Sequence, residues 1–519
     1  MIADASAARH RSSATALNDA WETVTASMAR IVRKHAYLVN SRVTIARLPA
    51  ELLCQAFALL DTRDRITTTH VCRHWREVAL EASVLLWTHI ADIRRPSTLR
   101  ALLERAQGAP VDISELFVDN DSDPLFSALM GHMPHIRTLR FRFRGPVARI
   151  ADSSSLGIIL RSSAPILERL SILGDAAARS AVSLTAIPNM FGGFAPVLRN
   201  IQLLGTSVNA DFFAQLPSAQ VVRTCTVGGY RCMISYPTVE TLVRALPGLH
   251  TLNIEMMYWN LLRDAPPQGL PSTLQRINLR TTTVDGLNPR GVIPEREGWN
   301  SIPSIHVAHT LMRITGPDDS PGAPCYLPQG AQDPIVMIDM RIDNSIQRIH
   351  VRTIDAAQRE RAYTNIFAWH AETLLGDAVA ESVTMLSIMA SHKLVERIRS
   401  VNWPALRTLR IVAVSRASVE SLNTITRGPI SMPVLQNVEF STDSLTTESL
   451  WHDEEVELIL EVVKTREGPL QQVTFLGCNP PAELVTQSLI PKHAQRSEVQ
   501  PNWKAPAGEW FQQLPFDWD

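Results

Sequence analysis

Cysteine is scarce in this sequence of 519 residues, and its placement argues against two classes of protein. The six cysteines are scattered at positions 54, 72, 225, 232, 325 and 478, without a Cys-x-x-Cys pair. Structural zinc sites need closely spaced ligands, and small secreted domains need a dense disulfide framework. We therefore predict no metal site and a reducing compartment, the cytoplasm and/or the nucleus.

Long apolar runs and an excess of one charge are also missing. No run approaches the ~18–20 consecutive apolar residues that a membrane span needs. The 50 basic and 51 acidic side chains balance, so no overall field attracts nucleic acid or an acidic membrane. We therefore expect neither nucleic acid nor a membrane as partner. The start "MIADASAARHRSSATAL" lacks a signal-peptide core; it is typical of a mitochondrial presequence or of a disordered tail, and we predict a disordered tail over 1–16.

Catalytic motifs are absent too. The sequence contains no HExxH, P-loop, GxGxxG or GxSxG arrangement. His452 stands beside three acids, Asp453, Glu454 and Glu455, but acids at the start of a helix are expected from the helix dipole. We predict that the protein is not an enzyme and has no cofactor.

One short stretch, "VCRHWREVA" at 71–79, raises the question of a reactive or metal-binding site. A helix turns by about 100° per residue, so Cys72 and His74 point about 160° apart and cannot share a metal ion. Trp75, Val78 and Ala79 fall on one side together with Val71, with Cys72 at the edge. This pattern favours a docking or core helix over chemistry.

The chain is long enough for two or more domains or for an extended repeat array. After the tail, apolar residues at helical spacing predict a lead-in helix over 17–45; they are Leu17, Trp21, Val24, Met28 and Ile31. The sequence of residues 46–90 then indicates three short helices. The first is "LPAELLCQAFALL", the second follows the cap "DTRD", and the third is "THVCRHWREVALEA".

From about residue 110 a short template recurs, apolar-x-x-apolar-x-apolar, often just after a proline. Its eight clear copies start at Ile136, Leu167, Leu198, Leu249, Leu274, Leu406, Leu435 and Leu470, with weaker copies at Ile113 and Ile346. Such recurrence, with helical stretches between copies, indicates an irregular leucine-rich-repeat-like solenoid over 110–280 and 335–480. The alternative is a set of unrelated strands in an α/β domain.

Two segments depart from the template. Residues 281–334 carry eight prolines and six glycines, which predicts a long loop or partly disordered insertion. Residues 481–519 form a C-terminal tail whose aromatic end we expect to pack back on the body.

Residues 46–90 resemble an F-box. The matching elements are "LPAELL", "FALLDTRD", "VCRHWREVA" and the "LW" at 86–87, in the order and spacing of that family. Arg65 stands near a position where the family usually has an apolar residue. The predicted fold class is thus α/β, a small all-helical F-box unit followed by a leucine-rich-repeat-like solenoid of short parallel strands and helices. This architecture is similar to that of F-box proteins of mushroom-forming fungi.

The resemblance implies docking on the Skp adaptor of a cullin–RING ubiquitin ligase. The residues that it assigns to the adaptor are Leu48, Pro49, Leu52, Leu53, Val71, Cys72 and Trp75. In the alternative interpretation, Leu52, Phe57, Trp75 and Trp87 form a local core that packs on the first repeat.

The second expected site lies on the strands, where residues alternating with the template form the exposed concave face. In "LRFRFRG" these are Arg140, Arg142 and Arg144, which could bind a phosphate- or carboxylate-rich target. The alternative is an ordinary solvated strand face.

Two functions remain open. One is a substrate-recognition subunit of an SCF-type (Skp–cullin–F-box) ubiquitin ligase, whose solenoid binds a target protein. The other is a protein-interaction scaffold outside any ligase, in which the F-box-like helices cap the solenoid.

Overall fold

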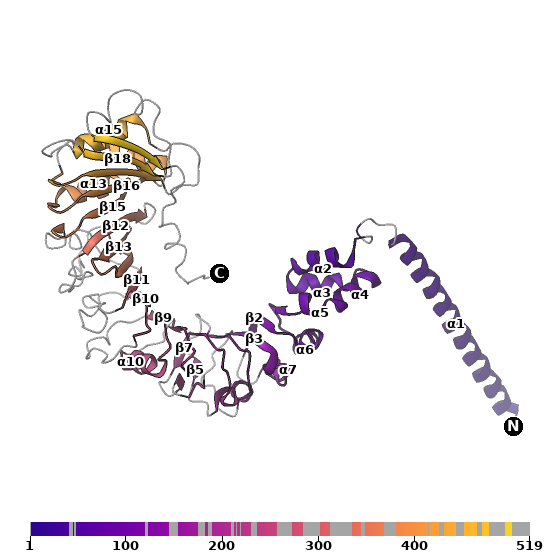
Figure 1. Cartoon of the computed structure of the whole chain (residues 1–519). Helices are drawn as coiled ribbons and strands as arrows, with labels where there is room; N and C mark the ends of the chain where they lie inside the picture. The colour runs from indigo at the N-terminus through magenta and orange to yellow at the C-terminus, as the bar shows by residue number, and fades with distance from the viewer. Residues whose placement is uncertain are drawn as a thin grey trace.

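The computed structural model consists of a long helix, a small helical unit and a curved sheet (Figure 1). It describes residues 2–40, 45, 48–119, 123–144, 154–174, 182–184, 189–208, 212–213, 215–217, 219–229, 236–256, 272–283, 302–311, 335–343, 348–367, 380–413, 415–424, 430–442, 451–463, 470–476 and 494–500. The chain is α/β, as predicted, and the structural statements below concern these residues.

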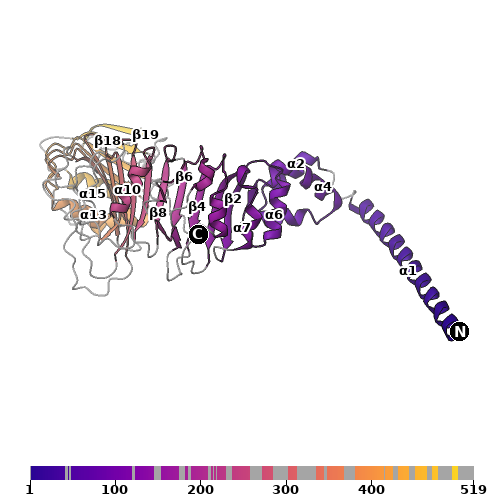
Figure 2. The same cartoon turned by 90° about the horizontal axis from the view of Figure 1, so that it is seen from below.

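Helix α1 spans Ile2–Asn40 and extends away from the rest of the molecule (Figures 1 and 2). The prediction of a disordered tail over 1–16 is therefore wrong, since the helix starts at residue 2. The reason lies in the composition, because alanines recur through this stretch and alanine has the highest helix propensity. The lead-in helix is confirmed, with an earlier start than the predicted residue 17.

The helical unit, residues 48–90, contains four helices: α2 (Ala50–Ala58), α3 (Thr62–Thr68), α4 (Arg73–Glu81) and the one-turn α5 (Ser83–Leu86). The predicted cap is confirmed, because the Asp61 carboxylate accepts the N–H of Asp64 at 2.7 Å. The core of the unit is apolar and fully buried, formed by Leu53, Phe57, Val78, Ala79, Leu86 and Trp87.

Arg65, the departure from the F-box pattern, is buried in this unit and tied to backbone carbonyls. Its guanidinium donates to the carbonyls of Leu86 and His89, the latter at 2.8 Å. Burial lowers the pKa of Arg65, and the nearby Asp61 opposes that effect. The arginine therefore connects α3 to the segment that enters the sheet.

The sheet described by the structure has 17 strands. Their spatial order is the same as their order in the chain except at β12–β14. In spatial order the strands are β1 (His89–Ile90), β2 (Val111–Val118), β3 (Ile136–Phe143), β4 (Arg169–Leu173), β6 (Asn200–Leu204), β8 (Thr224–Gly228), β9 (Thr251–Met256), β10 (Arg276–Thr283), β11 (Ser304–Leu311), β14 (Glu360–Phe367), β13 (Arg348–Asp355), β12 (Ile335–Asp343), β15 (Met385–Met389), β16 (Thr408–Ala413), β17 (Asn437–Thr442), β18 (Leu470–Leu476) and β19 (Ala494–Gln500). Strands β5 (Val182–Leu184) and β7 (Thr206–Val208) form a separate parallel pair.

Strand β13 is antiparallel to both of its neighbours, whereas the other pairings in the sheet are parallel. Strand β14 pairs with β11, and β12 pairs with β15, so three strands enter the sheet in reverse spatial order. The weak template copy at Ile346 leads into β13, and the prediction of a regular parallel repeat strand there is wrong. A template of apolar spacing carries no information about strand direction.

The template residues form the core of the sheet. In β3, for example, Ile136, Leu139 and Phe141 are fully buried, and the corresponding residues of the other seven clear copies are buried as well. A single apolar cluster runs from Leu53 in the helical unit to the last strand. The template thus identified buried strands correctly.

Two segment predictions need correction. Residues 304–311, inside the predicted loop 281–334, form strand β11, which pairs in parallel with β10. Residues 494–500, inside the predicted tail, form β19 on the edge of β18. Prolines flank β11 without entering it, so their density along the chain hid a short strand. The expected packing of the aromatic end, 501–519, lies outside the described residues.

Helices connect the strands, and Figures 1 and 2 place α6, α7 and α10 on the outer side of the arc that the sheet forms. The connecting helices are α6 (Pro96–Arg105), α7 (Pro124–Leu129), α8 (Ser155–Leu160), α10 (Tyr236–Ala245), α13 (His392–Arg399), α14 (Arg416–Glu420) and α15 (Asp453–Val462). The opposite, concave side of the sheet is lined by strand residues.

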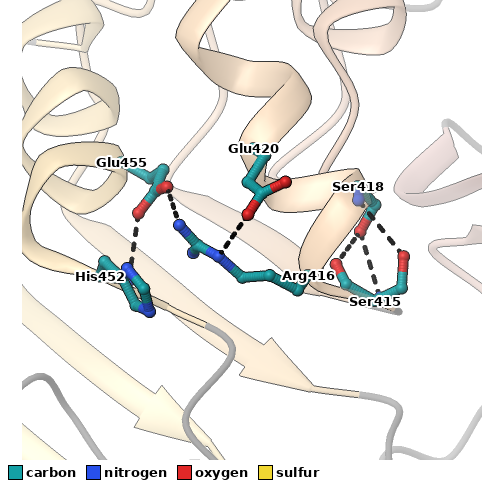
Figure 3. Close-up of polar contacts among 6 residues, drawn as sticks. All are labelled: Ser415, Arg416, Ser418, Glu420, His452 and Glu455. Atoms are coloured by element: carbon teal, nitrogen blue, oxygen red, sulfur yellow. Dashed lines mark hydrogen bonds and ion pairs between the residues drawn. The ribbon is translucent and has the colours of Figure 1, made fainter.

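An ion pair joins helices α14 and α15 (Figure 3). Arg416 donates to Glu455 at 2.6 Å and to Glu420 at 3.1 Å. Glu455 also accepts the backbone N–H of His452 at 3.1 Å, which caps the start of α15. The cluster of His452 with three acids therefore serves to start a helix and to join it to its neighbour, in line with the interpretation from the helix dipole.

Candidate functional site

Helix α2 has a buried face and an exposed apolar face. Leu53 and Phe57 point into the core, and Leu53 is 1% exposed. Leu52 and Leu59, seven residues apart and so on one side of the helix, are 49% and 89% exposed. Leu48 and Pro49 are also exposed. A short helix with apolar side chains on both faces is typical of a unit that binds a partner.

The start of α4 adds a second exposed element. Val71 precedes the helix and is exposed, and the sulfur of Cys72 accepts the N–H of Trp75 at 3.5 Å as the helix N-cap. Trp75 is half-buried, with its ring 5.1 Å from that of Phe57. Val71 and Cys72 thus lie outside the helix, and the predicted common helical stripe is correct only for Trp75, Val78 and Ala79.

Most residues of the adaptor set predicted from the sequence are at least partly exposed, with one exception. Leu48, Pro49, Leu52 and Val71 are exposed, and Cys72 and Trp75 are partly exposed. Leu53 is wrong as a contact residue, because its side chain lies in the core beside Phe57. The alternative, a local core, is correct for Phe57 and Trp87, correct in part for Trp75, which packs against that core, and wrong for Leu52.

Sequence analysis missed four apolar residues that the structure exposes on this unit. They are Leu59, Leu80, Val84 and Leu85. The signal for Leu59 was its position seven residues after Leu52, which places both on the face opposite the core. Leu59 joins the exposed apolar residues of α2 and of the turn before α4, hereafter the outer face of the helical unit: Leu48, Pro49, Leu52, Leu59 and Val71.

The Cys54 thiol is not set up for chemistry. Burial raises the pKa of Cys54, and the nearby Glu51 and Glu81 raise it further. A raised pKa keeps the thiol protonated, and the protonated form is a poor nucleophile and metal ligand. Among the described residues, no three His, Cys, Asp or Glu side chains are placed to hold a metal ion.

The inner face anchors the unit to the sheet. The Trp87 indole N–H donates to the carbonyl of Ala79 at 2.8 Å, and the Arg105 guanidinium of α6 lies 5.0 Å from the Trp87 ring centre. Strand β1 then pairs directly with β2. The helical unit is therefore joined to the sheet region through Trp87 and β1.

The predicted arginine stripe is only partly available. Arg142 forms an ion pair with Glu115 of β2 at 2.5 Å, and the Arg144 guanidinium, just beyond the end of β3, lies 3.9 Å from the ring centre of Phe117. Arg140 is partly buried, and its Nε has no hydrogen-bond partner within the described part of the chain. Residues of β2 thus already contact Arg142 and Arg144, and the role of the three arginines in target binding stays a prediction.

The concave side is also less open than predicted at β9 and β10. Asn253, Glu255 and Asn278 are at most 5% exposed. Asn253 donates to the Thr226 hydroxyl at 2.9 Å, and Asn278 donates to the Asn253 side-chain oxygen at 2.6 Å. Arg410 and Glu439, further along, form an ion pair at 2.7 Å. Neighbouring strands thus satisfy one another's polar groups.

One cluster on this side combines residue types known from catalysis. Ser304 and His306 of β11 are 3.1 Å apart, and Glu360 of β14 lies 3.5 Å from His306 and 2.6 Å from Arg352. Burial alone would raise the pKa of Glu360, but the hydrogen bond from His306 and the charge of Arg352 outweigh it and lower the pKa to about 2.

This cluster does not have the geometry of a catalytic triad. Serine and glutamate both approach the same imidazole nitrogen, Nε2, whereas a triad needs the acid on the other one. Arg352 also engages the glutamate directly. The contacts explain the cluster as a polar junction between β11, β13 and β14.

Comparison with known proteins gives one assignment. A family model described as F-box-like matches residues 45–92, which agrees with the predicted 46–90. No curated protein matches the chain. No described helix has both the length and the apolar character for crossing a lipid bilayer.

Proposed function

We propose that this protein is a non-catalytic substrate-recognition subunit of an SCF-type ubiquitin ligase. The F-box-like unit would bind the Skp adaptor and through it a cullin, since F-box domains generally bind this adaptor. The observation that carries the proposal is the outer face of the helical unit, whose leucines are exposed while β1 and Trp87 join the unit to the sheet region.

The physical argument rests on apolar area. Leu52 and Leu59 are exposed, and burial of a leucine side chain contributes about 1.5–3 kcal/mol. Their support is already folded and joined to one core cluster, so little ordering cost remains on binding. A preformed apolar face of this kind is what a helical adaptor surface would recognise.

In this proposal the curved sheet is a leucine-rich-repeat-like solenoid that presents a target protein. Support comes from its parallel strands in chain order, its buried template residues and the helices on its outer side. Solenoids of this type bind partners on their concave side. Arg140 and Arg142 on β3 and Arg144 just beyond it are the proposed target contacts, and Arg140 is the least engaged by its neighbours.

The adaptor test uses the full chain and a purified Skp adaptor. We expect Leu52→Ala combined with Leu59→Ala to weaken binding by a factor of about 30 or more, because central interface residues contribute about 2 kcal/mol or more. Isothermal titration calorimetry measures the change. The matched control is Phe194→Ala, which removes an apolar side chain that is also exposed but lies far along the chain.

Unchanged affinity in the double variant, with the fold intact by circular dichroism, would contradict the proposed interface. An equal loss of adaptor affinity in the Phe194→Ala control would show that binding depends on exposed apolar side chains in general and not on the outer face.

The scaffold hypothesis has its own supporting observation, namely that the helical unit and the sheet share one core. In that case the helices close the end of the sheet and need no adaptor. The same experiment distinguishes the two functions. If the protein is a scaffold, the wild-type chain does not bind the adaptor. If it is a ligase subunit, the wild-type chain binds the adaptor and only the variant with a changed outer face loses affinity.

The target site needs a separate test. Arg140→Gln should reduce capture of a target protein and leave adaptor affinity unchanged, because β3 lies outside the helical unit. Arg137→Gln is a suitable control, since that arginine lies on the same strand and is already bound to Asp112. Quantitative proximity labelling compares the three chains, and an identical set of partners in all of them would rule out the site.

A further inference from the structure

Two histidines, His132 and His135, lie in the short connection between α7 and β3, outside the outer face of the helical unit. The Nδ1 atom of His132 is 3.3 Å from the Nε2 atom of His135. The ring centres are 5.1 Å apart, and the ring planes are inclined by 45°. Both residues are partly exposed. Two imidazole nitrogens thus come together near the surface of the molecule.

The sequence of this connection explains why the two rings meet. Residues Met133–His135 form a 3₁₀ helix that His132 precedes, and the N–H of His135 donates to the carbonyl of His132 at 3.1 Å. Side chains three residues apart are eclipsed in a 3₁₀ helix, so both rings project to the same side. Pro134 fixes one backbone torsion, and Met133 is fully buried. The turn therefore holds the pair in place without any ligand.

The distance between the two nitrogens fits a shared metal ion. Good hydrogen bonds from N–H groups are about 2.7–3.2 Å long, with most near 2.9–3.0 Å, so 3.3 Å is long for one. Two histidine nitrogens that bind one zinc ion at about 2.0–2.1 Å, with a tetrahedral angle between them, are about 3.3–3.4 Å apart. Both rings could therefore bind one ion without a movement of the backbone.

The surroundings favour the form of histidine that binds metals. Burial lowers the pKa of His132, Arg100 adds to this effect, and Glu104 of α6 opposes it. Burial and the neighbouring His132 lower the pKa of His135. Both rings are therefore neutral at pH 7 and above, and the neutral imidazole is the metal ligand.

Glu104 supplies a negative charge beside the pair. Helix α6, which carries Glu104, packs against α7 (Figures 1 and 2). The carboxylate is exposed and acts on His132 through its charge. In metal sites a carboxylate commonly accepts the N–H of the second ring nitrogen of a ligating histidine, which raises the metal affinity.

We propose that His132 and His135 bind one Zn²⁺ ion through Nδ1 and Nε2, with Glu104 as the carboxylate partner of His132. Imidazole nitrogen is a preferred ligand of zinc. Within the described part of the chain no set of three His, Cys, Asp or Glu side chains surrounds such an ion, so water occupies its other positions. The prediction of no metal site came from the spacing of cysteines, which does not concern a pair of histidines.

Isothermal titration calorimetry of the full chain with zinc chloride tests the site. We expect the wild-type chain to bind one more zinc ion than His132→Asn combined with His135→Asn. The native cysteines are present in both chains, so the difference isolates the histidine pair. The matched control, His74→Asn, removes an exposed histidine of α4 and should bind zinc as the wild type does. Equal zinc stoichiometry and affinity in the wild type and the double variant would overturn the proposal.

A spectroscopic measurement on the wild-type chain guards against misfolding of the variants. Copper(II) binds nitrogen ligands more tightly than zinc does, and its unpaired electron reports them directly. With one equivalent of copper(II), the electron paramagnetic resonance spectrum should show coupling to two imidazole nitrogens. Single substitution of His135 by Asn should remove one of them. A spectrum without two coupled imidazoles in the wild type would also overturn the proposal.

The role of Glu104 has its own variant. Glu104→Gln should weaken zinc binding by a factor of about 10, because loss of a carboxylate partner of a ligating histidine costs about 10–100-fold in metal affinity. Glu454→Gln, which changes an exposed glutamate of α15, is the matched control. Equal zinc affinity in the two variants would refute the role of Glu104. Adaptor binding is measured separately, so its failure leaves these tests unaffected.

Discussion

Adjacent leucines in α2 have different roles, which only their orientation distinguishes. Leu53 is in the core and Leu52 is on the outer face, although both belong to the same "LPAELL" element. A helix rotates by about 100° between them, so one rotation decides which residue stabilises the fold and which can bind a partner.

Leu53→Ala should lower the free energy of unfolding by about 2–5 kcal/mol, because it leaves a cavity in a fully buried site. Leu52→Ala should change it by about 0.5 kcal/mol or less, as expected for a surface position. Urea unfolding followed by circular dichroism compares the two. A larger effect for Leu52→Ala than for Leu53→Ala would contradict the assignment of faces.

Arg65 provides a second prediction at this scale. Arg65→Met keeps the length of the side chain and removes the donors to the carbonyls of Leu86 and His89. We expect a loss of about 1–3 kcal/mol in the free energy of unfolding, because the buried Leu86 carbonyl is left without this donor. Thermal unfolding measures it, with Arg63→Met, an exposed arginine in the same helix, as the control. Equal melting temperatures for the two variants would refute the role of Arg65.

Individual strands could be predicted from the sequence because burial in them depends on local spacing. All eight clear template copies form buried strands, and the same template occurs unnoticed at three more strands. These are β8, with Val222, Cys225 and Val227; β15, with Val383, Leu386 and Ile388; and β11, with Ile302 and Ile305. A systematic search for the apolar spacing alone finds all three.

Strands β9 and β10 lead to a prediction about pH. Glu255 is 5% exposed, and burial raises its pKa to about 7, opposed in part by Arg280 in the neighbouring strand. The folded chain therefore keeps this proton up to about pH 7, whereas the unfolded chain loses it near its ordinary value of 4.5. The protonated Glu255 carboxyl therefore makes its full contribution to the free energy of unfolding below about pH 4.5, and this contribution is lost as the pH rises to about 7.

Glu255→Gln should remove this loss, because the amide stays neutral at every pH. We expect the variant to be more stable than the wild type above about pH 7 and similar to it below about pH 4.5. Urea midpoints of both chains across this range give the difference. A constant difference at every pH would show that the carboxyl does not titrate as inferred.

At the scale of the whole molecule, the helical unit and the sheet form one body, whereas α1 stands apart. The apolar cluster starts at Leu53 and includes no residue of α1. Strand β1, at the end of the helical unit, is already part of the sheet.

Two deletions test this division. Removal of residues 1–40 should leave the urea midpoint of the remaining chain unchanged, because α1 contributes nothing to the core cluster. Removal of residues 1–90 should give an aggregated or unfolded product, because it uncovers the edge of β2 and the apolar residues beneath Trp87. A folded, monomeric sheet after the second deletion would show that the helical unit is an independent domain.

The sequence alone missed the start of α1 and the strands β11 and β19. It did indicate the short helices of the F-box-like unit, the eight clear buried strands and the position of that unit. These properties follow from periodicity and caps, which act over a few residues. Tertiary structure alone decided that Leu53 is covered, that Glu115 and Phe117 engage Arg142 and Arg144, and that β13 runs against its neighbours. Each of these depends on contacts between residues far apart in the chain, or on strand direction, and the spacing of apolar residues specifies neither.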